Sequence, residues 1–172
     1  KKLIEILIFA PVMVPTVAVA MGIHLSFFKM GIGNTFFGVV LIQLIPCIPY
    51  GVKILTSVFE IIGDSMEMQA KVLGASPFQT FRYITLPLIV PGIISASSMI
   101  FIVSFSQYFL NFLIGGGRVV TFSTMMFPFI QSGDRMMGSV YSIVFILTTL
   151  ICLMIMEKAI RHYYKSGNFF YS

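Results

Sequence analysis

Few side chains in this chain have types and spacing that could do chemistry, and none of them forms a recognisable reaction centre. His24 lies alone in an apolar run, where a structural role is expected. Cys47 and Cys152 have no cysteine or histidine nearby at a metal-binding spacing, so we expect both to be small core residues. Gly115 to Gly117 are not followed by the Gly-Lys-Ser/Thr of a phosphate loop. We therefore expect no catalytic residue, no metal site and no cofactor in this chain.

Polar side chains inside apolar runs are the remaining candidates for a functional site. They cost free energy in lipid and tend to face the interior of a helical bundle. If residues 87–113 form one helix, Ser104, Gln107 and Asn111 share a face, because they are spaced i, i+3 and i+7. Hydrogen bonding between helices and contact with a translocated substrate explain this pattern equally well. The candidate path residues are Gln43, Pro46, Ser104, Gln107, Tyr108 and Asn111.

The composition of the chain excludes an ordinary soluble domain. Hydrophobic residues make up 58% of the sequence and charged residues 10%, and the mean hydropathy is +0.98. Soluble domains average about 45–50% apolar and about 25% charged residues. Four runs without Lys, Arg, Asp or Glu each cover the roughly 20 residues needed to cross a bilayer, at residues 6–28, 30–52, 83–117 and 136–156.

The four neutral runs predict an all-α, polytopic transmembrane helical bundle. Their apolar residues do not alternate with polar ones, which disfavours a transmembrane β-barrel. We expect a short turn at residues 29–34 to make the first two spans an antiparallel hairpin, and a short helix at about 121–130. The four predicted spans are at about 4–28, 34–56, 87–113 and 137–157.

The basic residues predict the orientation of the bundle. Cytoplasmic connections carry an excess of Lys and Arg. If the connection at about 57–86 is cytoplasmic, the larger set of basic residues lies on that side: Lys1, Lys2, Lys53, Lys71, Arg82, Lys158, Arg161 and Lys165. The opposite side then holds only Lys29, Arg118 and Arg135. We interpret the net charge of +5 as topology and contact with anionic lipid, and expect no nucleic-acid partner.

The connection at about 57–86 carries the signals of a first short helix. Asp64 precedes Ser65, and Glu67 follows three residues later, which is the spacing of a capping box. Gly74 suits the left-handed position just beyond a helix. The pattern predicts a helix over about 65–73.

A second short helix is predicted directly after Gly74. Ser76 is a favourable cap, Pro77 suits the first helical position, and Gln79 completes a capping-box spacing. We expect this helix to end at Leu86-Pro87. Helices this short are marginal alone. They either fold back on their own bundle or dock on a cytoplasmic partner, and the caps do not decide between these interpretations.

The spacing of this connection resembles the EAA loop of permease subunits in binding-protein-dependent ABC importers, which have the type I or MetI-like fold. That loop reads Glu-Ala-Ala, three residues, Gly, nine residues, Ile, one residue, Leu-Pro. The chain departs from it at Met68, where Glu is usual, and at Gln69, where Ala is usual, although Glu67 lies one residue earlier. The matching residues are Ala70, Gly74, Ile84, Leu86 and Pro87.

The resemblance implies a single permease domain over 1–172, with one or two further spans before residue 1, in the inner membrane of a prokaryote. The helix at 65–73 would be a coupling helix seated on one of two cytoplasmic ATP-binding subunits, where ATP hydrolysis would occur. The coupling residues would be Asp64, Glu67, Met68, Gln69, Ala70, Leu73, Gly74, Ser76, Pro77, Leu86 and Pro87.

The resemblance also implies further partners and a substrate class. A second permease subunit, identical or different, would complete the path. An extracytoplasmic solute-binding protein would meet residues 29–34 and 114–135. The sequence around 115–135 resembles that of permeases for polyamines, iron and thiamine. The resemblance implies that the substrate would be a polyamine, a metal or another small solute.

Two other functional classes fit the composition less well. A secondary transporter or channel driven by ion gradients would carry ionisable residues or a filter-like loop within the membrane, and the four neutral runs contain neither. A purely structural scaffold gives no reason for a capped two-helix connection.

Overall fold

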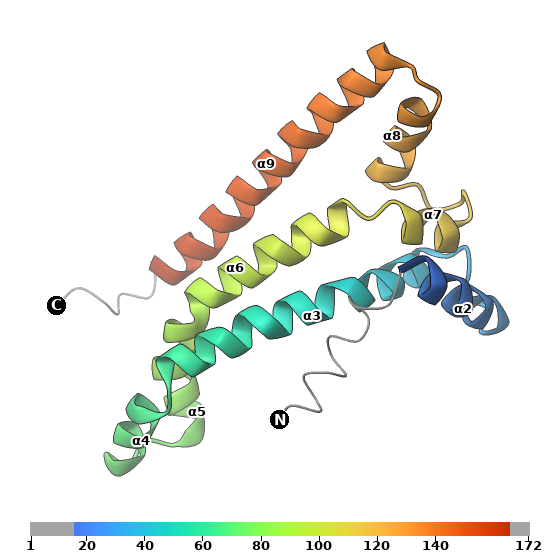
Figure 1. The fold of residues 1–172 in the computed structure, drawn as a ribbon. Helices are drawn as coiled ribbons and strands as arrows, with labels where there is room; N and C mark the ends of the chain where they lie inside the picture. The colour runs from blue at the N-terminus through green and yellow to red at the C-terminus, as the bar shows by residue number, and fades with distance from the viewer. Residues whose placement is uncertain (1–15, 166–172) are drawn as a thin grey trace. The chain divides into compact units, whose positions relative to one another are not determined.

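The computed structural model describes residues 16–165, and every regular element in this range is a helix (Figure 1). The predicted all-α class is confirmed. The chain divides into two compact units, unit 1 from Lys1–Pro49 and Ile100–Cys152, and unit 2 from Tyr50–Met99 and Leu153–Ser172. The elements are α2 Thr16–Lys29, α3 Phe36–Ile62, α4 Ser65–Val72, α5 Pro77–Thr80, the π-helix η1 Phe81–Thr85, α6 Leu86–Phe105, α7 Phe109–Gly115, α8 Phe122–Gln131 and α9 Arg135–Lys165.

Three helices of the described residues are long and apolar enough to cross a membrane, namely Phe36–Ile62, Pro77–Phe105 and Arg135–Arg161. The first and third correspond to the spans predicted at 34–56 and 137–157. The span predicted at 4–28 lies partly outside the described residues, which contain its second half as α2. It stays a prediction.

The span predicted at 87–113 has the wrong boundaries at both ends. Its helix begins at Pro77, because α5, η1 and α6 follow one another without a gap, and the expected end at Leu86-Pro87 does not occur. In the π turn, the backbone N–H of Leu86 bonds to the carbonyl of Phe81. Such a wide turn lets a helix accommodate a proline that lacks its own N–H. Pro87 therefore continues the helix instead of ending it.

At its other end, this helix stops at Phe105, and residues 106–108 are not helical. The chain then resumes as α7. A break at membrane depth is tolerated where protein groups satisfy the freed backbone. Here the carbonyl of Gln107 accepts hydrogen bonds from the side chains of Asn111 and Ser123. Hydrophobicity alone does not reveal this break, because residues on both sides of it are apolar.

The core of unit 1 joins α2, α3 and α7. Its buried residues are Ala20, Val39, Ile42, Leu110 and Ile114. The turn predicted at residues 29–34 is present, with Gly31 and Asn34 at positive φ, and it is tied to α7 by a 2.8 Å bond from the Asn34 N–H to the Ile114 carbonyl. Helix α2 contacts α7 in this core. The antiparallel hairpin of the first two spans stays a prediction, because the first span lies partly outside the described residues.

Aromatic rings hold the first part of α9 within unit 1. The ring of Phe145 lies 4.8 Å from Phe105 and 5.8 Å from Phe122 between centroids, and Tyr141 stacks on Phe129 at 4.9 Å. Helix α8, Phe122–Gln131, confirms the short helix predicted at about 121–130. No residue in the apolar window of α9 is fully buried by the described residues, as expected for a helix that faces lipid or another membrane subunit.

Candidate functional site

The connection between α3 and the helix that begins at Pro77 is shorter than predicted. Because α3 continues to Ile62, the connection comprises only residues 63–76 and contains α4. We call residues 63–85 the elbow, which includes α4, the turn at 73–76, α5 and η1. All of it belongs to unit 2.

The N-terminal cap predicted for α4 is wrong in its chemistry. Asp64 is the N-cap residue, but its backbone is in the right-handed helical region and its side chain makes no capping hydrogen bond. A side-chain cap requires an extended N-cap backbone. Glu67 does not reach back to residue 64 either. Its carboxylate Oε1 instead accepts a 2.5 Å hydrogen bond from the hydroxyl of Thr85 in η1. The Glu67 side chain is therefore bonded to Thr85, a residue distant in sequence, and does not complete the capping box.

The end of α4 has the geometry that the sequence predicted. Gly74 has a φ of +82°. Its N–H bonds to the carbonyl of Lys71 at 3.0 Å, and the N–H of Ala75 bonds to the carbonyl of Ala70 at 3.0 Å. This pair of bonds is a Schellman motif, which satisfies the last carbonyls of a helix and requires a left-handed residue at this position. The turn at Gly74 is therefore closed and specific.

The cap predicted for the second helix is also confirmed. The Ser76 hydroxyl accepts from the Gln79 N–H at 3.3 Å, and the Gln79 side chain accepts from the Ser76 N–H at 2.8 Å. Pro77 occupies the first helical position. These reciprocal bonds satisfy two backbone donors that the start of a helix leaves free.

Small side chains form the buried face of the elbow, and large apolar side chains form its exposed face. Ala70, Thr80 and Thr85 are buried at 5%, 4% and 7% exposure. At the end of α4, Val72 is 88% and Leu73 87% exposed, and Met68 and Gln69 of α4 and Phe78 of α5 are exposed as well. Exposed apolar side chains at the tip of a polar connection are typical of a contact surface.

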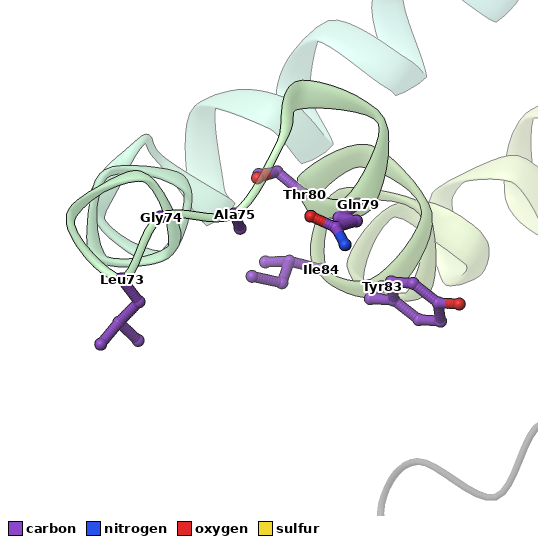
Figure 2. A pocket seen from close by; sticks show the side chains of 7 residues that line it. All are labelled: Leu73, Gly74, Ala75, Gln79, Thr80, Tyr83 and Ile84. Carbon is purple, nitrogen blue, oxygen red and sulfur yellow. The ribbon is translucent and has the colours of Figure 1, made fainter.

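An open groove of about 410 Å³ lies in the elbow, beside the Gly74 turn. Figure 2 shows Leu73 on the α4 side of this groove and Tyr83 and Ile84 on the η1 side, with the backbone of Gly74 and Ala75 between them. The elbow therefore offers a partner both a protruding apolar tip and a recess next to it.

A second candidate site is a polar cluster in unit 1, in which Asn111 and Ser123 are buried and Gln43, Ser104 and Gln107 are half-buried. The amide nitrogen of Gln43 donates to Oδ1 of Asn111 at 2.9 Å, and the hydroxyl of Ser104 donates to Oε1 of Gln43 at 2.5 Å. The Gln107 carbonyl accepts from Asn111 Nδ2 at 2.6 Å and from the Ser123 hydroxyl at 2.7 Å. Asn111 is 1% exposed. The cluster thus ties α3, α6, α7 and α8 to one another.

The structure brings four of the six predicted path residues together, although not by the predicted route. Ser104, Gln107 and Asn111 do not share the face of one helix, because the chain breaks between α6 and α7. They meet through Gln43 and through the Gln107 backbone. The ring of Tyr108 stacks on Phe127 at 3.7 Å, and Pro46 lies half-buried inside α3. This arrangement favours hydrogen bonding between helices as the role of the cluster.

Sequence reasoning did not select Thr85 or Ser123. Each hydroxyl has its partner far along the chain, at Glu67 for Thr85 and at the Gln107 carbonyl for Ser123. The available signal was a hydroxyl residue inside or beside an apolar run, which is common in membrane helices and so selects neither residue.

Comparison with known proteins decides the class of the chain. Residues 1–165 match the family described as "Binding-protein-dependent transport system inner membrane component". The chain belongs to this family. It is therefore a multi-pass membrane protein of a prokaryotic plasma membrane, in a family of transport proteins.

The relatives of this inner membrane component transport different solutes, according to their names. The "Spermidine/putrescine transport system permease protein PotC homolog" of Mycoplasma genitalium is 27% identical over 73% of this chain and 44% of its own length. The "Fe(3+)-transport system permease protein FbpB 2" of Haemophilus influenzae is 24% identical over 84% and 29%. The "Putative 2-aminoethylphosphonate transport system permease protein PhnV" of Salmonella paratyphi A is 24% identical over 92% and 60%.

The chain covers less than two thirds of the length of each of these relatives. No solved structure matches it. For this family member, the residues that carry the EAA-loop resemblance have defined local roles. Ala70 is buried and Gly74 takes the left-handed position, while Leu86 and Pro87 lie where the π turn passes into α6.

Proposed function

We propose that this chain is a permease subunit of an ABC importer, and that an ATP-binding subunit docks on the elbow and moves it. The observation that carries the proposal is the continuity of the helix Pro77–Phe105, which begins in the elbow and continues as a membrane-crossing helix. Because a helix transmits displacement along its axis, movement of the elbow enters the membrane domain directly.

The elbow has the stiffness that such a role requires. Isolated helices of fewer than about 12–15 residues are marginal in water. Here α4 is closed by the Schellman motif at Gly74, α5 begins with the Ser76 capping box, and the Glu67–Thr85 bond joins α4 to η1. A connection fixed at these points passes a displacement on instead of absorbing it.

The charge distribution supports a cytoplasmic elbow. Among the described residues, the predicted topology places Lys53, Lys71, Arg82, Lys158, Arg161 and Lys165 on the side of the elbow, and Lys29, Arg118 and Arg135 on the opposite side. The side with more basic residues is cytoplasmic under the positive-inside rule. This orientation presents Val72 and Leu73 to cytoplasmic ATP-binding subunits. Residues 29–34 and 114–135 then face an extracytoplasmic solute-binding protein, and a second permease subunit and lipid cover the apolar helices.

The proposed substrate is a small polar solute. The relatives are named for a polyamine, for Fe(3+) and for 2-aminoethylphosphonate. Their names therefore do not indicate whether the substrate of this chain is positively or negatively charged. The four neutral runs contain no carboxylate that would stabilise a cation within the bilayer. Selection of the solute is therefore assigned to the binding protein, and the permease supplies the path.

Site-specific crosslinking tests the docking proposal. The chain is co-expressed with the ATP-binding subunit that is encoded next to its gene and carries a phosphate loop. The complex is then reconstituted in nanodiscs. A cysteine at Leu73 (Leu73→Cys) should crosslink to that subunit. The matched control is Val120→Cys, which is 60% exposed in a connection assigned to the opposite side. Crosslinking at residue 120 but not at residue 73 would overturn both the docking site and the orientation.

A further inference from the structure

The hydrogen bond between Glu67 and Thr85 joins two parts of the elbow that are 18 residues apart in sequence. Glu67 lies on α4, on the same side as buried Ala70, and its carboxylate points back toward the helix that follows the turn. Thr85 is 7% exposed and is the last residue of η1. The bond therefore crosses from α4 to the point where η1 passes into α6.

A displacement of α4 has two routes into the helix Pro77–Phe105. One is the chain itself, through the turn at 73–76, where Gly74 is at positive φ. The other is direct contact between α4 and η1. A hydrogen bond from a hydroxyl to an ionised carboxylate is shorter and stronger than one between neutral groups. The bond also holds α4 and η1 in one relative orientation, because a hydrogen bond is directional. Packing of small side chains such as Ala70 and Thr80 is not directional.

The position of Glu67 supports the second route, which is direct contact between α4 and η1. In the resembled EAA pattern the acid stands where this chain has Met68, and Met68 is 59% exposed here. The acid of this chain lies one residue earlier and is turned inward. Its carboxylate is therefore engaged within the chain and not presented to a partner, and the exposed face of α4 is left to Met68, Val72 and Leu73.

We infer that Glu67 and Thr85 are positioning residues, and that their hydrogen bond carries the movement of α4 into the membrane helix Pro77–Phe105. The inference rests on the proposed function and adds the route by which the docked elbow acts. The bond reaches the helix at its π turn, immediately before Leu86 and Pro87. A push applied there enters α6 without passing through the Gly74 turn.

Two readouts separate this role from docking and from folding. The first is solute transported per ATP hydrolysed, measured in nanodiscs or liposomes with the ATP-binding subunit and binding protein. Thr85→Val keeps the shape of the side chain but removes the donor. It should bind the ATP-binding subunit and hydrolyse ATP as the unaltered chain does, while transport per ATP falls about tenfold, the factor that corresponds to losing a hydrogen bond to a charged group. Thr85→Ser retains the hydroxyl and should restore the ratio.

The Glu67 side gives a matched pair of variants. Glu67→Ala should lose coupling to the same degree as Thr85→Val, and the double variant should be no worse than either, because both remove one interaction. Glu67→Asp keeps the charge and falls one methylene short, so it tests the geometry in a variant expected to fold. Transport per ATP unchanged in Thr85→Val or in Glu67→Asp would overturn the inference, and so would failure of Thr85→Ser to restore it.

The second readout needs no partner. Amide hydrogen exchange of residues 63–72 in the full chain should be about tenfold faster in Thr85→Val than in Thr85→Ser, because the bond no longer holds α4. Equal exchange in the two variants overturns the inference even if the ATP-binding subunit docks. If exchange differs as expected but no ATP-binding subunit crosslinks at residue 73, the proposed function fails and the bond is only structural.

Discussion

Gln43 and Asn111 lie 68 residues apart and are joined by a 2.9 Å hydrogen bond between their side-chain amides. Asn111 uses its oxygen for Gln43 and its nitrogen for the Gln107 carbonyl, so both ends of its amide are engaged. The residue thus satisfies the backbone at the break between α6 and α7 and fixes that break to α3. This arrangement makes Asn111 the residue of the cluster on which the local fold depends most.

Replacing Asn111 with leucine should destabilise the protein. Asn111→Leu keeps the volume but leaves the Gln43 amide and the Gln107 carbonyl with fewer partners. The expected cost is about 1–3 kcal/mol, the penalty for a buried polar group that loses its bond, measured by thermal unfolding in nanodiscs. Ser106→Ala is the control, because Ser106 is exposed and its hydroxyl donates to the Val103 carbonyl of its own turn. Equal stability of the two variants would contradict the structural role of the cluster.

The packing of Val58 against Gly92 predicts a second effect, within unit 2. A Cβ atom added at Gly92 would lie 2.6 Å from Cγ2 of Val58. Gly92→Ala should therefore destabilise by about 1–3 kcal/mol, as overpacking does. Adding Val58→Ala should recover most of the loss, since it removes the clashing methyl groups. Gly22→Ala is the control, because nothing lies within 4 Å of a Cβ there. Failure of the double variant to recover would show that the clash is not the cause.

Local signals in the sequence predicted local geometry well. The Ser76 capping box and the left-handed Gly74 were both predictable, because each donor and acceptor lies within five residues of its partner. The equivalent spacing at Asp64 and Glu67 gave a wrong prediction. There, a partner 18 residues away competes for the carboxylate. A capping box can therefore be predicted only when no tertiary partner claims its acidic residue.

The boundaries of the membrane helices show the same limit. Apolar composition placed the starts of α3 and α9 to within two residues. It also predicted one continuous helix where the structure has α6 and α7, separated by residues 106–108. The break depends on the donors that reach the Gln107 carbonyl from Asn111 and Ser123. The continuation through Pro87 depends on the π turn at Phe81–Thr85. Both are properties of the folded chain that a hydropathy average does not contain.

The two caps of the elbow should respond unequally to the same kind of substitution. Ser76→Ala removes the side-chain acceptor of a complete capping box and should cost about 0.5–2 kcal/mol, seen as faster hydrogen exchange at residues 78–80. Asp64→Ala should have a smaller effect, because the Asp64 side chain makes no capping bond and contributes only its charge near a helix start. The reverse order of the two effects would show that the predicted Asp64 cap forms after all.

The turn at Gly74 predicts the effect of a β-branched residue on coupling. Nothing lies within 4 Å of a Cβ at this position, so a substitution meets backbone strain at φ +82° and no steric clash. A left-handed conformation costs an ordinary residue about 1–2 kcal/mol, and more for valine because its side chain is branched at Cβ, whereas asparagine adopts it more readily.

Gly74→Val should therefore open the Schellman turn, and Gly74→Asn should keep it. Both variants should insert into the membrane and allow ATP hydrolysis, because residue 74 lies outside the membrane helices. Only Gly74→Val should lose solute uptake per ATP, measured in liposomes with the ATP-binding subunit and binding protein. Full uptake in Gly74→Val would refute the requirement for a stiff elbow. Equal loss in both variants would instead assign the effect to contact at the groove beside Gly74, since asparagine keeps the turn and still adds a side chain there.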